Sequence, residues 1–279
     1  MTALVCGIGD EAAPHLPDQL RIHTELGFAG IELRTVSGRG LHELSDSDAD
    51  AVAEAVAATG MRVPVVDTPI GGWSGTVADD LDRDVEILRC SAARAASLGC
   101  RRLRVMSYPN DGRPPAAWRS EAIRRMRVLA GVAADLDVVL LHENCHGWGS
   151  QSAATTIELI ETVGSGHLRL LFDVGNGLAY GYDAVPFLRS ILPWVDHVHV
   201  KDGVRGPDGA VFGLPGDGDA DVAGCLRLLG DAGYAGWYSL EPHVTHIPHL
   251  RVSADPARLE AGYRACADRF LAVLGAVHA

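Results

Sequence analysis

The chain has 279 residues, a net charge of −12 and 47% hydrophobic residues, so it is long enough and apolar enough to bury a substantial core. The negative charge argues against a nucleic-acid-binding surface, because contacts to phosphates require clustered Lys and Arg. No apolar stretch approaches the length of a membrane span and the first residues lack a basic region, so we expect no membrane anchor and no signal peptide.

Short apolar runs alternate with longer amphipathic stretches along the chain. Eight runs are predicted strands: Leu4–Gly7, Gly30–Arg34, Arg62–Val66, Arg102–Met106, Val138–Glu143, Leu168–Asp173, His197–Lys201 and Trp237–Glu241. Predicted helices lie near residues 16–26, 47–59, 79–98, 116–135, 152–163, 183–192, 221–230 and 256–275. Repeated strand–helix alternation predicts a single α/β domain over residues 1–279, a (β/α)8 TIM barrel. A doubly wound sheet would need fewer units and a glycine-rich first turn.

The last four predicted strands each end in a residue that can bind a metal: Glu143, Asp173, His199 and Glu241. Active sites of the predicted fold collect at the carboxyl ends of the strands. Three carboxylates and one imidazole suit a divalent cation, with Mn²⁺ expected first and Co²⁺, Mg²⁺ or Zn²⁺ as alternatives. A single such residue is as readily explained as a polar cap of its strand. Four consecutive strands that end in this way favour one metal site.

Lys201 is the only lysine in the chain, against 23 arginines. It lies two residues after His199, so both side chains face the same side of the predicted strand. A lone ammonium can mark a position where the planar guanidinium fork would not serve. We predict that Lys201 contacts a substrate hydroxyl or a developing oxyanion, with an ion pair to a neighbouring carboxylate as the alternative. His197 faces the same side but lies deeper, and we interpret it as a histidine that supports a metal ligand or packs in the core.

Four segments resemble the successive motifs of the sugar phosphate isomerase/epimerase family, in the xylose-isomerase-like TIM-barrel superfamily. They are Leu141–Asn144, Leu171–Asn176, His197–Asp202 and Gly236–Glu241. The resemblance spans nearly the whole chain and implies that Glu143, Asp173, His199 and Glu241 bind one catalytic metal. It also implies that the two glutamates remove and return a proton next to a substrate carbonyl, through a metal-stabilised enediolate.

The predicted substrate contacts are Arg205, His142, Asn176 and Glu32. Arg205 stands where the ketose 3-epimerases of the family have a substrate-binding arginine, and Glu32 lies near the end of the second predicted strand. The chain departs from those epimerases at Asn176 and Gly149, which stand in place of a histidine and a glutamate. These departures argue against epimerisation of a free ketohexose and leave the broader resemblance intact.

The predicted function is isomerisation or epimerisation of a small sugar, keto-sugar or cyclitol. A lyase is the alternative, because the same enediolate can expel a β-hydroxyl or open a keto-glycoside. A binding protein that keeps the site is a third hypothesis, and the charge argues against a DNA-cleaving relative such as endonuclease IV. The six cysteines lack C-x-x-C spacing and are typical of reduced thiols, so we expect a cytoplasmic protein, and a homodimer is compatible with the sequence.

Two groups of residues stay ambiguous in the sequence. His243, His246 and His249 follow Glu241 in a loop, which we interpret as a mobile lid, with the mouth of the site or a second metal as alternatives. Aromatic residues follow the third to sixth predicted strands, where stacking on a sugar ring and ordinary loop packing are equally good interpretations; they are Trp73, Tyr108, Trp148 and Tyr180.

Overall fold

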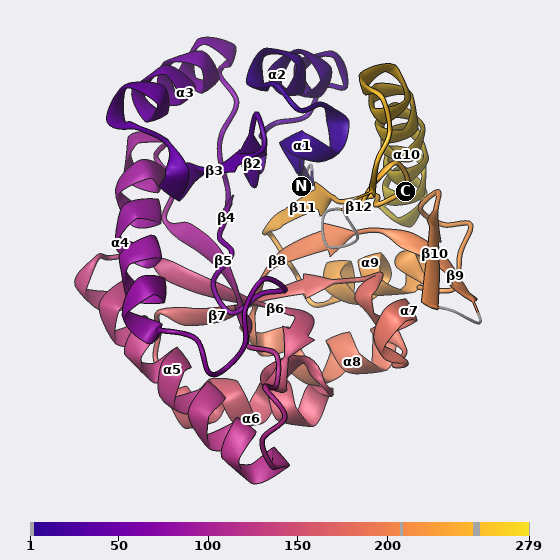
Figure 1. The fold of residues 1–279 in the computed structure, drawn as a ribbon. Coiled ribbons are helices and arrows are strands. Elements are labelled where there is room, and N and C mark those ends of the chain that lie inside the picture. Colours follow the sequence, from indigo (N-terminus) through magenta and orange to yellow (C-terminus); the bar gives the residue numbers. More distant parts are fainter. Residues whose placement is uncertain (1–2, 207–208, 248–251, 279) are drawn as a thin grey trace.

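The computed structural model describes residues 3–206, 209–247 and 252–278, and a seven-stranded parallel sheet runs through its middle (Figure 1). The strand order is β1-β11-β8-β7-β6-β5-β4. The strands are β1 (Leu4–Gly7), β4 (Val66–Asp67), β5 (Arg102–Ser107), β6 (Val139–Gly147), β7 (Leu168–Asp173), β8 (Val195–Val200) and β11 (Trp237–Leu240). Their parallel order brings all the carboxyl ends to one side, as the predicted strand–helix alternation requires.

The second predicted strand, Gly30–Arg34, does not form a regular strand. Residues 29–33 make isolated parallel bridges instead, Ile8 to Glu32 on one side and Leu33 to Val66 on the other. Backbone hydrogen bonds follow the same path, from the Glu32 amide to the Gly7 carbonyl and from the Asp67 amide to the Leu33 carbonyl. The segment therefore lies between β1 and β4 without a continuous ladder, and full closure of an eight-stranded barrel stays a prediction.

A tight hairpin follows the interrupted ladder. Strands β2 (Thr35–Val36) and β3 (Arg39–Gly40) pair with each other directly after Arg34. Their turn uses the left-handed conformation at Ser37 and Gly38, with φ of 52° and 75°. The hairpin takes the chain out of the sheet and leaves β4 with only two residues, shorter than the predicted strand at Arg62–Val66.

Helices surround the sheet on its outer side (Figure 1). The long ones are α2 (Leu16–Glu25), α3 (Asp46–Thr59), α4 (Leu81–Ser97), α5 (Pro115–Asp135), α6 (Ala153–Val163), α8 (Ala184–Ile191), α9 (Val222–Asp231) and α10 (Pro256–His278). They confirm all eight predicted helices within two or three residues at each end. Short α1 (Gly9–Ala12), α7 (Asn176–Tyr180) and three 3₁₀ turns, at Leu41–Glu43, Trp148–Ser150 and Leu192–Trp194, complete the helical elements.

Two further hairpins follow β8 and β11. The first joins β9 (Asp202–Gly206) and β10 (Gly209–Gly213), and the second joins β12 (His246–Ile247) and β13 (Val252–Ser253). The buried carboxylate of Asp202 holds the first one against the turn before α9, since it accepts hydrogen bonds from the backbone amides of Gly216, Gly218 and Ala220 at 2.8–3.1 Å. These additions lie at the carboxyl ends of the strands, where the sequence predicted the site.

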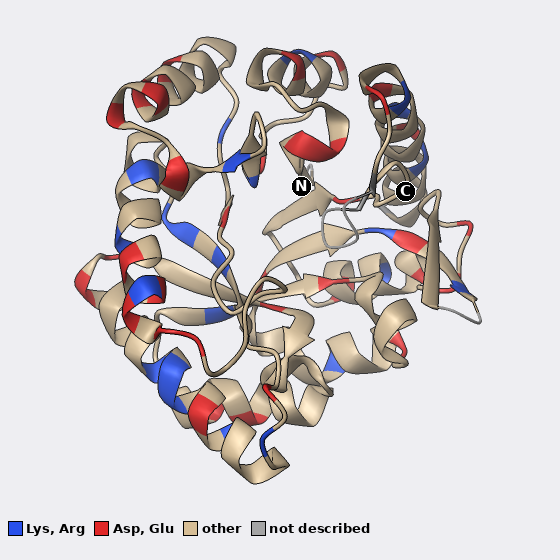
Figure 2. Ribbon diagram, in the orientation of Figure 1, with Lys and Arg blue, Asp and Glu red and all other residues tan. Residues whose placement is uncertain are grey.

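Acidic and basic residues alternate along outer helices such as α4 and α5 rather than separating by sign (Figure 2). Arg124 and Arg125, from the arginine-rich run in α5, both pair with Glu121 of the same helix. Both of these guanidinium groups thus have an acidic partner within α5. Among the described helices, none is long and apolar enough to span a membrane.

Candidate metal centre

The four predicted metal ligands meet at the carboxyl ends of neighbouring strands. Glu143 lies in β6, Asp173 ends β7, His199 lies in β8 and Glu241 directly follows β11. One potential ligand atom of each lies within 4.8 Å of those of the other three, and all four residues are buried. The His199 Nδ1 atom is 3.3 Å from Glu241 Oε2, 3.8 Å from Asp173 Oδ2 and 4.0 Å from Glu143 Oε1. We call these four residues the metal-site cluster.

The imidazole of His199 is held by its far nitrogen. Nε2 lies 3.0 Å from Glu32 Oε1, which leaves Nδ1 facing the three carboxylates, and Nδ1 has no hydrogen-bond partner among the described residues. Burial lowers the pKa of His199, but Glu32 and Glu241 outweigh burial and raise it well above the ordinary value. A positive charge is therefore favoured between this nitrogen and the carboxylates, as a proton on the ring or as a bound cation.

Carboxylates outnumber cationic side chains around the cluster. Seven buried carboxylates each pair with a basic side chain in or next to the cluster: Asp10, Glu11, Glu32, Asp67, Glu143, Asp173 and Glu241. The Lys and Arg residues paired with them in the described chain are Arg34, Arg104 and Lys201. If all seven were ionised, the three cations would leave an excess of four negative charges, which a buried site holds only with protons or a metal ion. Burial raises the pKa of Asp67 well above its ordinary value, so protons meet part of that excess.

Three cationic side chains orient the two glutamates. Lys201 Nζ lies 2.8 Å from both Asp173 Oδ2 and Glu241 Oε2. Arg104 Nη1 lies 2.9 Å from Glu143 Oε2, and Arg34 Nη1 lies 2.8 Å from Glu241 Oε1. Each glutamate is thus fixed by a charged partner at one oxygen or both. Each arginine pairs with a glutamate from a different segment of the sheet, so these pairings depend on tertiary structure.

Protonation differs among the three carboxyl groups. Burial raises the pKa of Asp173 to about 7, although Lys201 opposes the shift. Burial also raises the pKa of Glu143, but Arg104, His199 and Lys201 together outweigh it, and the pKa lies below the ordinary value. The pKa of Glu241 is lowered well below its ordinary value, chiefly by Lys201 against burial. Both glutamates are therefore ionised at neutral pH and able to accept a proton.

A cavity of about 520 Å³ opens above the cluster. Its lining includes Glu143, Glu241 and Lys201, together with Asn176, Cys145, Phe212 and His243. Burial lowers the pKa of Lys201, but Asp173 and Glu241 raise it well above the ordinary value, so its amine stays an ammonium and is unsuited to Schiff-base chemistry. Trp73 is 42% exposed at the edge of the cavity and stacks on His146, with 4.2 Å between ring centroids.

The predicted substrate contacts fall in different places. Asn176 lines the cavity and donates from Nδ2 to Glu143 Oε1 at 3.0 Å. His142 is fully buried on the other face of β6, because neighbouring strand residues point to opposite sides, and its ring lies 3.5 Å from Ser150 Oγ. Arg205, in β9, pairs with Asp183 at the start of α8 at 2.9 Å. Neither His142 nor Arg205 lines this cavity, and their role in substrate binding stays a prediction.

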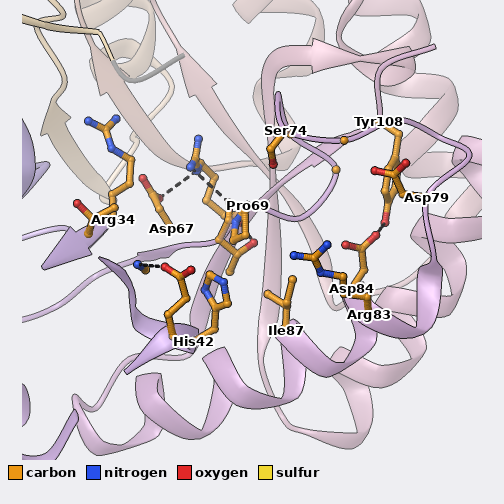
Figure 3. Close-up of a pocket in the computed structure, with 18 of the residues that line it drawn as sticks. Arg34, His42, Asp67, Pro69, Ser74, Asp79, Arg83, Asp84, Ile87 and Tyr108 are labelled. Carbon is orange, nitrogen blue, oxygen red and sulfur yellow. Dashed lines mark hydrogen bonds and ion pairs between the residues drawn. The ribbon is translucent and has the colours of Figure 1, made fainter. Parts of the chain in front are cut away.

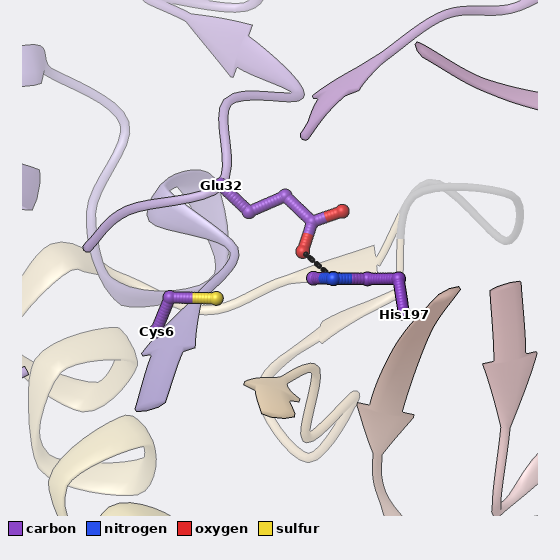
Figure 4. A group of neighbouring side chains, drawn as sticks. All are labelled: Cys6, Glu32 and His197. Atoms are coloured by element: carbon purple, nitrogen blue, oxygen red, sulfur yellow. Dashed lines mark hydrogen bonds and ion pairs between the residues drawn. The ribbon is translucent and has the colours of Figure 1, made fainter. Parts of the chain in front are cut away.

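Glu32 does not line this cavity either, and its contact with a substrate stays a prediction. It is fully buried behind His199, and its second oxygen lies 2.9 Å from His197 Nε2 (Figure 4). Cys6 completes a second group of potential ligands with Glu32 and His197, with one such atom of each within 4.8 Å of the others. We call these three residues the inner cluster. Glu32 links the inner cluster to the metal-site cluster, because one of its oxygens contacts His197 and the other contacts His199.

The histidines after Glu241 are only partly described. His243 lines the cavity, and its Nδ1 lies 2.8 Å from Glu11 Oε1. His246 is half-buried in β12, and His249 lies outside the described residues. Glu11, Glu241 and His243 form a further group of potential ligands within 4.8 Å. In that group Glu11 and Glu241 both pair with Arg34, so a guanidinium already supplies the positive charge.

Residues 20–266 match the family model of the xylose isomerase-like TIM barrel. The chain belongs to this family. The inosose dehydratase of Clostridium botulinum is 26% identical over 128 residues, a match that covers 40% of this chain and 43% of that protein. The chain thus spans less than half the length of the curated relatives that it matches.

Solved structures of family members share the fold over nearly the whole chain. The IOLI protein with a bound zinc atom has a TM-score of 0.78 at 16% identity, and the match covers 98% of each chain. An L-ribulose 3-epimerase has a TM-score of 0.77 at 18% identity, over 99% of this chain and 96% of that one. A family protein from Mycobacterium smegmatis in complex with magnesium has a TM-score of 0.72 at 18% identity and full coverage of both. At these identities the similarity concerns the fold.

Proposed function

We propose that the protein is a divalent-metal-dependent isomerase or epimerase of a sugar, keto-sugar or cyclitol. One observation carries the proposal: the unpartnered Nδ1 of buried His199 faces three carboxylates beside an open cavity. Together with the excess of negative charge, this donor set fits a divalent cation held by Glu143, Asp173, His199 and Glu241. Mn²⁺ is the proposed ion, because oxygen donors with one imidazole suit a cation of intermediate hardness.

The side chains of the cavity can move a proton between carbon and oxygen. When bound, the metal would polarise a substrate carbonyl and stabilise the negative charge that develops on its oxygen. Glu241 or Glu143 takes the proton from the adjacent carbon, and the electron pair of the broken C–H bond moves into the substrate as an enediolate. Inversion follows when the other glutamate, after taking a proton from solvent, delivers it to the opposite face of the same carbon, while the first glutamate releases its proton to solvent. Carbonyl transfer follows when the proton is delivered to the neighbouring carbon and a hydroxyl proton moves between the two oxygens. Lys201 and Arg104 hold these carboxylates ionised and in place.

A dehydratase is the second candidate. Curated relatives that the chain matches include inosose dehydratases, although the match covers only part of each chain. The first proton abstraction would be the same, and a β-hydroxyl would then leave as water after accepting a proton. Lys201 and His243 both line the cavity and carry donors for that step. Product identity separates the two reactions, since only the dehydratase forms an enone and releases water.

The test is solvent hydrogen exchange in D₂O with Mn²⁺ and a panel of ketoses, inososes and keto-glycosides. We expect deuterium at the carbon next to the carbonyl and about one metal ion per chain. Glu143→Gln and Glu241→Gln should each fold normally and lose on the order of 10³-fold or more in exchange, because each removes a general base. The exposed Glu54→Gln in α3 is the matched control and should retain wild-type rates.

Two results would contradict the proposal. Full exchange in a thoroughly chelated sample would remove the metal from the reaction. Wild-type exchange in both Gln variants would remove the glutamates from proton transfer.

We also propose a reducing, cytoplasmic setting, which is supported by the six cysteines, all of them free thiols and five of them buried.

A further inference from the structure

A second cavity adjoins the one above the metal-site cluster. Its volume is about 680 Å³, and it lies between the loop after β4, the Leu41–Glu43 turn and the start of α4 (Figure 3). Six residues line both cavities: Arg34, Thr68, Pro69, Gly72, Ser74 and Arg104. Each cavity alone is within the range of about 300–1,000 Å³ that is usual for small-molecule sites. The pair therefore offers room for a ligand with two parts.

The boundary between the cavities is made by one loop and two arginines. Within the loop, Trp73 lines only the metal-side cavity, whereas Gly75 and Thr76 line only the second one. Arg34 and Arg104 line both, and each is anchored to a glutamate of the metal-site cluster, at 2.8 Å and 2.9 Å. A ligand that reached from one cavity into the other would pass the same arginines that hold the proposed catalytic bases.

The lining of the second cavity is polar and carries a negative balance. Five carboxylates line it, Glu43, Asp67, Asp79, Asp80 and Asp84, against the guanidiniums of Arg34, Arg83 and Arg104. Arg34 and Arg104 already pair with buried carboxylates. A phosphate would thus meet more negative than positive charge, which disfavours an anionic group here.

Two groups in this lining are ready to bind hydroxyls. Asp67 is only 3% exposed, yet neither of its carboxylate oxygens accepts a hydrogen bond, although Oδ1 lies 3.2 Å from Arg104 Nε. Arg83, in the first turn of α4, has no hydrogen bond or ion pair to another residue of the described ranges. Figure 3 shows Asp67 beside Arg34 and Arg83 beside Asp84. Hydroxyl groups donate to a carboxylate and accept from a guanidinium, so a polyol fits both.

We infer that the substrate has two parts: a reacting keto-sugar or keto-cyclitol ring in the metal-side cavity, and a neutral glycosyl group in the second cavity. The identity of the reacting ring rests on the proposed function. The place and chemistry of the second group rest on the lining of the second cavity alone. The protein thus belongs with enzymes acting on glycosides rather than on free monosaccharides or sugar phosphates.

Calorimetric binding in the presence of Mn²⁺ tests the inference without requiring turnover. The ligands are matched pairs: a free ketohexose and its glucosyl derivatives, and a free inosose and its galactosyl derivatives. We expect at least one glycoside to bind tenfold or more tightly than its free ring. Arg83→Gln removes a donor and Ile87→Trp fills the cavity from α4, so each should cancel that gain and leave binding of the free ring within twofold. Arg89→Gln, exposed on the same helix, is the control and should change neither.

The outcomes separate the two proposals. Tighter glycoside binding that depends on Arg83, without solvent hydrogen exchange in D₂O, would support the two-part ligand and contradict the isomerase. Exchange with free rings, together with equal binding of ring and glycoside, would support the isomerase and overturn the two-part substrate. Equal binding of every pair, loss of free-ring binding in Arg83→Gln, or no binding of any ligand would also overturn it.

Discussion

Two groups of buried potential metal ligands lie next to each other in this barrel, and they differ in what their atoms already do. The metal-site cluster has three carboxylates facing an unpartnered imidazole nitrogen, beside a cavity. In the inner cluster the carboxylate of Glu32 lies near the Cys6 thiol and the His197 ring, and all three residues are almost completely buried. In that cluster Glu32 gives one oxygen to His197 and the other to His199.

The difference shows that ligand type alone does not define a metal site. In the inner cluster, burial and the charge of Glu32 raise the pKa of Cys6 well above its ordinary value, so the sulfur stays a neutral thiol and a poor ligand. The metal-site cluster instead has surplus negative charge and an opening for a cation to enter. Unsatisfied charge and access distinguish the two, and each prediction below alters one side of this contrast.

Among the three changes that test this contrast, the largest effect is expected at Lys201, in the metal-site cluster. Its ammonium fits between Asp173 and Glu241, and its stem lies so close to Gly175 that an added Cβ there would stand 2.3 Å from Lys201 Cγ. Lys201→Arg keeps the charge but requires room for a planar fork. We expect kcat/KM to fall on the order of 100-fold or more, because displacement of either carboxylate misplaces the reacting groups. Wild-type kinetics would show that only the charge matters.

A smaller effect is expected at Glu32, which links the clusters. Glu32→Gln replaces one acceptor oxygen with an amide donor, so one of the two histidines loses its partner. Loss of an outer hydrogen bond of this kind typically lowers metal affinity by about 10–100-fold. Metal titration should show that loss, and saturating metal should restore most of kcat, because the ligands themselves remain. A loss of kcat that metal does not restore would make Glu32 a group that acts on the substrate.

The sequence predicted the fold well wherever a local pattern decides the structure. All eight helices followed from apolar periodicity, and six of the eight predicted strands lie in the sheet with nearly their predicted bounds. The segments at Gly30–Arg34 and Arg62–Val66 failed as regular strands, because they pair only through isolated bridges, Gly30 with Arg62 and Leu33 with Val66, in an interrupted ladder. That interruption depends on how neighbouring segments pair, which apolar alternation does not encode.

The same limit explains the site. The residue types at the strand ends correctly predicted that Glu143, Asp173, His199 and Glu241 lie close together. Period-two alternation correctly predicted that Lys201 lies beside them. Alternation also shows that His142 must face away from Glu143, a signal that was present and was missed. Partners across the barrel, such as Glu32 with His199 or Arg104 with Glu143, lie 167 and 39 residues apart in the chain and require the fold.

The smallest effect is expected at Cys6, in the inner cluster. If that cluster is a packed polar core rather than a metal site, Cys6→Ala should leave the metal content and kcat/KM within twofold of wild type. Removal of the fully buried sulfur should lower the free energy of unfolding by about 1 kcal/mol, as a shift of the denaturant midpoint at constant slope. A second equivalent of bound metal in wild type that Cys6→Ala removes would instead make the inner cluster a metal site. The contrast between the two clusters would then rest on their ions rather than on surplus charge and access.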